Sequence, residues 1–295
     1  MNILHYLRCP LCGSGFTRNN NVLSCPSGHS FDLAKEGYVN LLPPGKGKNA
    51  RTGDEKDMIR ARREFLALGF YAPISDGIAE MLANVLRDSS EVLLCDSGCG
   101  EGYHTLRITD ALEKAVSAPV LSVGFDASKF AAACGMKASA RGGFTGENGI
   151  GSEGDALVYF IPANIFSLPL ADGCVSAVIS MFAPVAVEEN LRVLREDGVL
   201  ITASSGVGHL REMRELLYTD VHMSDGTVPE YNGFVLADEK KVKYTVTLPD
   251  KKAIADLFTM TPFYYKTTEA GRERLYNTES LTLTVDTDLR IYRRK

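Results

Sequence analysis

Short apolar runs that alternate with helix-like stretches dominate the chain after residue 90. The runs are rich in β-branched residues and lie at 91–95, 120–125, 157–161, 177–181 and 199–203. Strands joined by crossover helices pair in parallel, so this alternation predicts an α/β fold with a mostly parallel sheet. Two later strand-like stretches, 241–248 and 280–292, are expected to complete a seven-stranded sheet, with this last pair antiparallel.

Two helices are predicted ahead of the first of these strands. Apolar residues recur at helical spacing through 57–68, and Gly69 follows as a helix end. A second apolar pattern of the same period covers 74–86. Between the N-terminal 42 residues and these helices lies a Pro/Gly/Lys-rich stretch, 43–57, which we interpret as a linker. The glycine-rich segment 140–155 is interpreted as an insertion.

Length and charge limit the class of protein. A chain of 295 residues can form two unequal domains, and no apolar run approaches the ~18 residues of a membrane span. The first ten residues lack a secretory signal pattern, so a cytoplasmic protein is expected. The net charge of −5 argues against a strongly basic nucleic-acid binder. Residues 46–63 nevertheless hold seven basic side chains against three acidic ones, which suits either an RNA contact or a solvated helix face.

Cysteine and histidine are clustered near the N-terminus. Cys9-Pro-Leu-Cys12 is followed, twelve residues later, by Cys25-Pro-Ser-Gly-His29. Two paired knuckles of this kind supply the four ligands of a tetrahedral zinc ion, and a site with four protein ligands is structural. The alternative is three buried free cysteines and an unrelated histidine. We expect a small zinc-binding domain at residues 1–42.

A glycine-rich turn follows the first predicted strand of the sheet. Asp96 precedes Gly98, Gly100 and Gly102, and Asp126 ends the next strand. Glycines let the backbone approach a ligand, and a carboxylate after the second strand can accept both ribose hydroxyls. The alternative is that the glycines only make turns and the aspartates only cap helices. The sequence lacks the P-loop pattern that binds triphosphates.

This turn resembles the S-adenosylmethionine-binding signature of the Rossmann-like (class I) methyltransferases. The resemblance implies that Gly98, Gly100 and Gly102 line the amino-acid part of the cofactor, with Asp96 nearby and Asp126 on the ribose. Two more residues of the turn, Glu101 and Tyr103, are included in the implied cofactor site. Asn164 occupies the position near the adenine where the family usually has an aspartate.

Together with the zinc knuckles, the chain resembles the bacterial 23S ribosomal RNA guanine-N1 methyltransferases. Further segments that carry the resemblance are Ala34–Leu42, Ala61-Arg-Arg-x-Phe-Leu66, Gly98–Tyr103, Ala183-Pro184 and Met260-Thr-Pro-Phe263. The resemblance implies a methyltransferase domain at 58–295, 23S rRNA as partner and substrate, and a homodimer with a cleft for an RNA hairpin. The insertion near 141–155 and Ser97 depart from the family pattern.

Methyl transfer to N1 of guanine needs alignment of the base and removal of the N1 proton. Phe182 and Pro184 follow the fourth predicted strand and are candidates to wall the base pocket. His209, just after the fifth strand, is a candidate base, although a hydrogen-bonded loop histidine is the alternative. Two other functions stay open: a small-molecule methyltransferase with an accessory zinc knuckle, and a non-catalytic RNA-binding protein on a methyltransferase scaffold.

Overall fold

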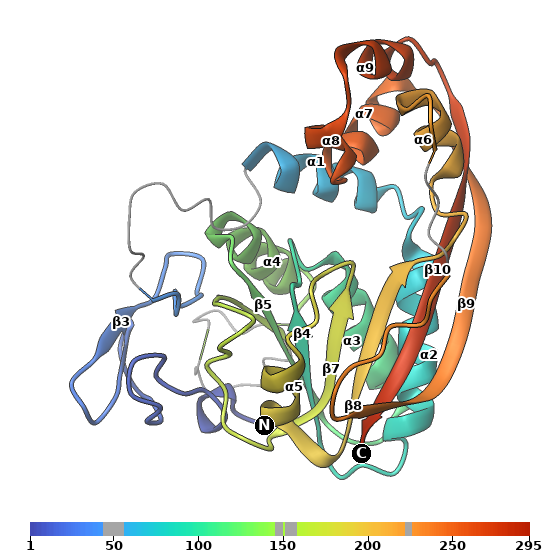
Figure 1. The fold of residues 1–295 in the computed structure, drawn as a ribbon. Helices are drawn as coiled ribbons and strands as arrows, with labels where there is room; N and C mark the ends of the chain where they lie inside the picture. Colours follow the sequence, from blue (N-terminus) through green and yellow to red (C-terminus); the bar gives the residue numbers. More distant parts are fainter. Residues whose placement is uncertain (44–55, 145–149, 151–157, 222–225) are drawn as a thin grey trace.

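The computed structural model describes residues 1–43, 56–144, 150, 158–221 and 226–295. Within them the main sheet has seven strands in the order β6-β5-β4-β7-β8-β10-β9 (Figure 1). The strands are β4 (Val92–Ser97), β5 (Val120–Asp126), β6 (Val158–Pro162), β7 (Val175–Met181), β8 (Leu194–Ser205), β9 (Phe234–Leu248) and β10 (Leu281–Arg294). Strands β4 to β8 pair in parallel, whereas β10 runs antiparallel to both β8 and β9. The predicted α/β fold with a mostly parallel seven-stranded sheet is confirmed.

The central strands are buried on both faces, because successive side chains of a strand point to opposite sides of the sheet. In β4, Val92 and Leu94 join one hydrophobic cluster, and Leu93 and Cys95 join the other. The first cluster is covered by α2 (Ala72–Leu86) and α3 (Tyr103–Ala115). The N-terminal module and the short helix α5 (Val187–Val193) contribute to the second.

The strand order reverses at β4, which lies between β5 and β7. The chain passes outward from β4 through α3 to β5, then through α4 (Lys129–Arg141) to β6, and returns to the other side of β4 as β7. Adjacent crossovers that leave in opposite directions open a crevice at the carboxyl ends of the strands. The topology therefore puts a ligand site at the end of β4.

The two helices predicted before the sheet are present as α1 (Lys56–Ala67) and α2, and Gly69 follows α1 with a left-handed φ of +79°. The strands β8 and β9 are longer than the predicted runs at 199–203 and 241–248. Most of the extra residues of β8 are polar, whereas β9 begins earlier with the apolar run Phe234-Val-Leu-Ala, which the prediction missed. Backbone pairing with β10 extends β9 over this run.

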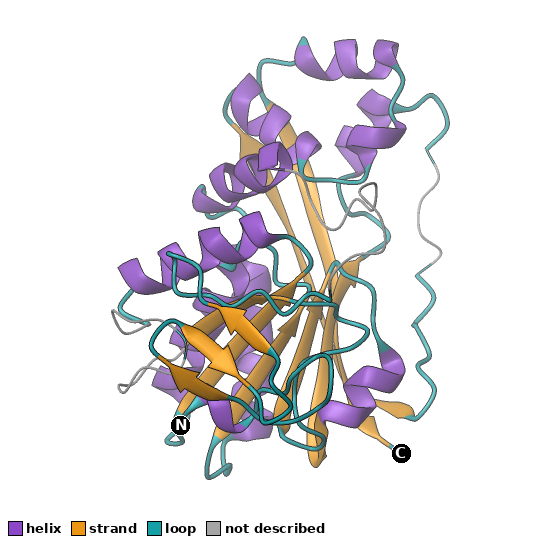
Figure 2. Ribbon diagram, turned by 90° about the vertical axis from the view of Figure 1, so that its left-hand side faces the viewer, coloured by secondary structure: helices purple, strands orange, loops and turns teal. Residues whose placement is uncertain are grey.

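The N-terminal module consists of a 3-10 turn, Ile3–His5, and a small antiparallel sheet of β1 (Thr17–Asn19), β2 (Val22–Ser24) and β3 (Ser30–Asp32). It lies against one side of the large sheet (Figure 2). The backbone N–H of Arg8 donates to Pro169 over 2.9 Å, and that of Leu41 donates to Pro162 over 2.9 Å. The module thus shares a core with the sheet. Most of the predicted linker 43–57 and of the insertion 140–155 lies outside the described residues.

A cap of helices lies beyond the carboxyl ends of the parallel strands. It comprises α1 and the C-terminal helices α6 (Arg211–Leu217), α7 (Lys251–Thr259), α8 (Phe263–Lys266) and α9 (Glu269–Tyr276), carried by the long β9–β10 hairpin (Figure 1). No single helix of the described part is long and apolar enough to cross a membrane; α1 and α2 meet that test only as a pair bent by 79°. The cap places α1 opposite the end of β4.

Candidate functional site

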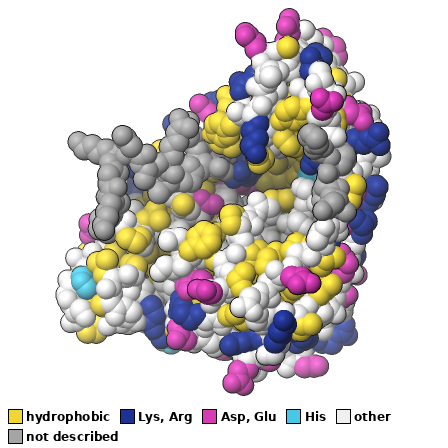
Figure 3. Space-filling view, viewed as in Figure 1, with side chains coloured by type: hydrophobic (Ala, Val, Ile, Leu, Met, Phe, Trp, Pro, Cys, Tyr) yellow, Lys and Arg dark blue, Asp and Glu magenta, His cyan; other side chains and the backbone are white. Residues whose placement is uncertain are grey.

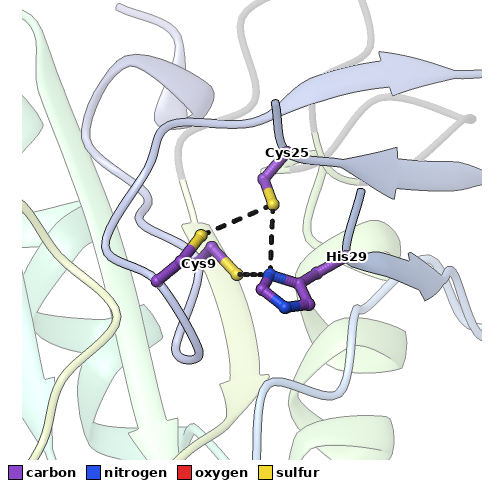
Figure 4. Close-up of side chains that lie close together, drawn as sticks. Cys9, Cys25 and His29 are labelled. Atoms are coloured by element: carbon purple, nitrogen blue, oxygen red, sulfur yellow. Dashed lines mark hydrogen bonds between the residues drawn. The ribbon is translucent and has the colours of Figure 1, made fainter. Parts of the chain in front are cut away.

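The four predicted zinc ligands come together in the N-terminal module. The ligand atoms of Cys9, Cys12, Cys25 and His29 all lie within 4.8 Å of one another. Nδ1 of His29 is 3.5 Å from Sγ of Cys9 and 3.4 Å from Sγ of Cys25 (Figure 4), and the Sγ atoms of Cys12 and Cys25 are 3.6 Å apart. Tetrahedral zinc, with Zn–S near ~2.3 Å and Zn–N near ~2.0 Å, separates its ligand atoms by about these distances. The donor set therefore fits structural zinc.

Each knuckle is a tight turn that closes on its first cysteine. The N–H of Gly13 donates to the carbonyl of Cys9 over 2.8 Å, and that of Gly28 donates to Cys25 over 3.0 Å. Both glycines have a positive φ, +73° and +83°, which side-chain-bearing residues rarely adopt. The glycines thus let both ligands of each pair point to one centre.

The glycine-rich turn lies in the crevice at the end of β4. Gly98 has a φ of +92°, and a Cβ on it would come within 2.7 Å of Cβ of Ala183. Gly102, at φ +90°, precedes α3, and a Cβ there would meet the ring of Phe160 at 2.4 Å. The backbone of β4 can turn into α3 beside β7 and β6 only because these side chains are absent.

Asp96 is buried in this turn and only partly hydrogen-bonded. Its side chain accepts a hydrogen bond on Oδ2 from the hydroxyl of Thr105, at 2.5 Å, whereas its Oδ1 has no partner among the described residues. Burial, together with the nearby charges of Asp126 and Glu101, raises the pKa of the Asp96 carboxyl to about 7. An unsatisfied buried carboxylate oxygen needs a donor, and a bound ligand with an N–H group can supply one.

Asp126 lies at the carboxyl end of β5, next to the turn. Its Oδ2 accepts the N–H of Gly100 at 3.0 Å, and its Oδ1 accepts the N–H of Ser128 at 2.7 Å. These two backbone bonds orient the carboxylate at the turn, and each carboxylate oxygen can accept more than one hydrogen bond. The structure therefore brings Asp96, Asp126 and the three glycines together at one edge of the sheet.

The other predicted cofactor residues are placed differently. Asn164 is exposed, and its Oδ1 accepts the N–H of Phe166 at 3.0 Å in the turn after β6. Glu101 turns back onto the N–H of Tyr103 at 3.4 Å, and burial raises its pKa. Glu101 and Tyr103 line a cavity of about 470 Å³ between α1, α3 and α4, which also includes Arg63 and Phe144.

The candidate catalytic residues follow β7 and β8. Phe182 has a left-handed φ of +51° and a side chain that is 45% exposed, and Pro184 is exposed as well. The ring of Phe182 stacks on that of His209, with centroids 5.7 Å apart. His209 is 5% exposed, and its Nδ1 accepts the N–H of Asp286 at 3.3 Å. Burial, followed by the charge of Arg214, lowers the pKa of His209 to about 4, so the ring is neutral at pH 7.

Three further residues lie at this site; from the sequence only Arg62 was considered, as one of the basic residues of 46–63 that suit an RNA contact. Thr105 holds Asp96, and Oη of Tyr71 lies 3.5 Å from Nε2 of His209. Arg62 lies over Gly100, since its Nη1 is 3.2 Å from where a Cβ of that glycine would be. Thr105 lies nine residues after Asp96. The only sequence signal for this contact was that the predicted helix would pack against the strand that precedes it. Figure 3 shows the surface hollowed between the cap helices and the body below them.

A family model and several individual proteins are similar to this chain. A zinc-ribbon family model described as "RlmA, N-terminal" matches residues 7–51. A protein of Micromonospora griseorubida that carries the name of a 23S rRNA (guanine-N1)-methyltransferase is 34% identical over 232 residues, covering 73% of this chain and 71% of the relative. The 23S rRNA (guanine(748)-N1)-methyltransferase of Streptomyces fradiae is 30% identical over 216 residues, covering 73% and 69%.

Three other proteins, one relative and two solved structures, are also similar to the chain. YxjB of Bacillus subtilis, which carries the same family name, is 29% identical over 295 residues, 96% of this chain and 95% of the relative. Solved structures that resemble the chain include YcgJ of Bacillus subtilis, with a TM-score of 0.44 and 17% identity over 74% of this chain and 98% of that one. A geranyl diphosphate methyltransferase has a TM-score of 0.41 and 17% identity over 74% and 85%.

Proposed function

The chain belongs to the 23S rRNA (guanine-N1)-methyltransferase family, and we propose that it transfers a methyl group from S-adenosylmethionine to N1 of a guanine in a 23S rRNA hairpin loop. The observation that carries this proposal is the 34% identity to a family member over 71% of that relative's length. The zinc-ribbon match and the cluster of four ligands at the N-terminus support the same assignment and a structural zinc ion.

The crevice at the end of β4 fits the cofactor. The unpartnered Oδ1 of Asp96 suits the ammonium group of the amino-acid part, which would pass over Gly98 and Gly100. Asp126 has acceptor capacity for the ribose hydroxyls, and Asn164, after β6, lies on the side expected for the adenine. When bound there, S-adenosylmethionine supplies an electrophilic methyl group.

Phe182 and Pro184 then wall the pocket for the base. An aromatic ring that is 45% exposed offers a stacking surface to a guanine that has left its own stack. The left-handed φ of Phe182 is a strained conformation that only firm surroundings maintain, and strain of this kind concentrates at functional sites. The imidazole of His209 packs against the ring of Phe182, so we assign His209 a positioning role.

His209 is poorly placed to accept the N1 proton. Its Nδ1 already accepts the N–H of Asp286, so the neutral ring carries its proton on Nε2, which faces Tyr71. We propose that the enzyme contributes alignment of N1 with the methyl group and that the proton leaves through water.

RNA is bound by the zinc module and by the basic face of α1. Lys56, Arg60 and Arg63 of α1 are exposed, and such side chains can neutralise phosphates despite the net charge of −5. The other basic residues of the 46–63 stretch, Lys46, Lys48 and Arg51, lie outside the described residues. Residues 1–42 and 58–295 are the RNA-recognition and methyltransferase units, joined by 43–57.

We further propose that the protein acts in the cytoplasm as a homodimer. Both properties follow from the family resemblance, and rRNA modification places the enzyme where ribosomes are assembled. Light scattering of the purified protein tests the second property: a mass near twice 32.1 kDa is expected, and a mass of 32.1 kDa contradicts it.

Labelled methyl transfer tests the function. The protein is incubated with methyl-labelled S-adenosylmethionine and unmodified 23S rRNA, and the RNA is digested to nucleosides. Label in 1-methylguanosine is expected. Label in another nucleoside would contradict the assigned atom, and transfer to small molecules alone would favour a small-molecule methyltransferase. Failure to bind the cofactor by a folded protein would favour a non-catalytic RNA-binding protein.

A further inference from the structure

Arg62 of α1 reaches across to the glycine-rich turn. Its Nη1 lies 3.2 Å, and its Cδ 3.7 Å, from the position of a Cβ on Gly100. Gly100 has a φ of +56°, and it donates its N–H to Asp126. The guanidinium therefore covers the middle of the turn, and the absence of a side chain at position 100 makes room for it.

The charges around the turn are mostly negative. Burial raises the pKa of Asp96, and the charges of Asp126 and Glu101 act in the same direction. Burial also raises the pKa of Glu101, whereas the charge of Arg62 lowers it. Burial and then the charge of Arg62 lower the pKa of His104 at the start of α3. Arg107 of α3 points away to Asp76, whose two carboxylate oxygens accept from it at 2.7 and 2.8 Å. Arg62 is a cation that lies directly over the turn.

The α-amino acid group of the cofactor would bring a positive ammonium and a negative carboxylate to this site. Its ammonium suits the carboxylates of the turn, whereas its carboxylate needs a cation and would be repelled by them. A guanidinium is the side chain best matched to a carboxylate, because its planar N–H groups can donate two parallel hydrogen bonds. The amino end of α3, a helix of 13 residues that starts at Tyr103, lies at the same turn and favours negative charge.

We propose that Arg62 binds the α-carboxylate of the cofactor, so that α1 recognises the amino-acid part of S-adenosylmethionine. This inference rests on the proposed function, since it concerns the cofactor of the same site. It gives α1 a second role: one face of the helix carries exposed basic residues, and Arg62 on the inner side contacts the cofactor turn. Cofactor binding then fixes the cap helix beside which the RNA would lie.

Calorimetry with two ligands tests this pairing. S-adenosylhomocysteine is compared with its decarboxylated analogue, which keeps the ammonium group and lacks only the carboxylate. The wild-type protein should bind the first about 10- to 100-fold more tightly, the range expected for a charge-assisted hydrogen-bonded pair. In Arg62→Ala this preference should fall at least about tenfold, and Arg62→Lys should retain part of it.

Arg60→Ala is the matched control, because Arg60 lies on the same helix and is paired at the surface with Asp57 over 3.6 Å. It should keep the wild-type preference. If Arg62→Ala weakens both ligands equally, or neither, the carboxylate contact is wrong while the proposed function stands. If the folded wild-type protein binds neither ligand, the proposed function fails together with the inference. Melting temperatures of the variants without ligand separate loss of contact from loss of folding.

Discussion

The ring of Phe182 stacks on the imidazole of His209, with the centroids 5.7 Å apart and the planes inclined by 27°. One ring is 45% exposed and the other 5%, so the pair connects the buried end of the sheet with its surface. Tyr71, the residue before α2, completes a cluster of three rings, with its centroid 6.1 Å from that of His209 and 6.5 Å from that of Phe182. Phe182 is the exposed ring of this cluster.

Removing the open ring should impair RNA methylation without affecting the cofactor. Phe182→Ala is expected to lower kcat/KM for RNA about 10- to 100-fold, because stacking of a base on an aromatic ring contributes about 1–3 kcal/mol. Phe182→Tyr keeps the stacking surface and should stay close to wild type. Steady-state kinetics and the Kd for S-adenosylhomocysteine check this. Weaker cofactor binding with an unchanged KM for RNA would contradict the assignment of Phe182 to the base.

His209→Asn separates a positioning role from a base. The amide oxygen can keep the hydrogen bond from the backbone of Asp286, and the amide cannot take up a proton at neutral pH. We expect kcat/KM to fall about tenfold, with the same shape of pH profile between about pH 4 and 9. If His209 were the base, the loss would be larger, and an ionisation of the wild-type profile would disappear.

The sequence was sufficient for the mostly parallel seven-stranded sheet and for the cluster of four cysteine and histidine ligands, since each depends on local spacing. Gly98, Gly100 and Asp126 are neighbours because the end of β4 and the end of β5 are in register, as parallel pairing requires. The role of Arg62 could not be read in this way, because its contact with Gly100 depends on how α1 docks onto the turn. The cluster of the Tyr71, Phe182 and His209 rings likewise joins three segments that are far apart in sequence.

Neutralising Asp96 should stabilise the protein without ligand in a pH-dependent way. Folding raises the pKa of this carboxyl from 3.8 to about 7, so its contribution to stability is fully present below about pH 4 and is lost as the pH rises through 7. Asp96→Asn, which can still accept the hydroxyl of Thr105, should therefore melt several degrees higher than wild type at pH 8 and about equally at pH 4. It should also weaken cofactor binding. A higher melting temperature of wild type at pH 8 would refute the burial argument.

Zinc should be bound in a ratio of one ion per chain and should contribute to the stability of the whole protein. The module buries Leu7 and Leu41 against the methyltransferase sheet. Unfolding of the module would therefore expose apolar side chains of the core that it shares with the sheet. Cys25→Ser is expected to lose the metal and lower the melting temperature. Cys174→Ser, a half-buried thiol outside the cluster, serves as control and should keep the metal. Mass spectrometry measures the metal content, and thermal melting measures the stability. Full zinc occupancy in Cys25→Ser would contradict the assigned ligands.

Replacing Gly102, just before α3, by alanine tests how tightly the turn is packed. Gly102→Ala would place a Cβ 2.4 Å from the ring of Phe160 at a φ of +90°. Gly173→Ala imposes a similar backbone strain, at φ +60°, with no atom within 4 Å of the new methyl group. We expect a loss of about 1–2 kcal/mol for Gly173→Ala and a clearly larger loss for Gly102→Ala. Urea unfolding measures both; equal losses would mean that Phe160 yields freely.

Primer extension on treated 23S rRNA tests the central claim most directly, because a methyl group on N1 blocks Watson–Crick pairing and stops the polymerase. The purified protein is incubated with unmodified 23S rRNA and S-adenosylmethionine, with Phe182→Ala as the impaired variant. The account predicts one strong stop next to a single guanine in a hairpin loop, dependent on the cofactor and weakened in the variant. Methyl transfer to the RNA without any such stop would contradict it.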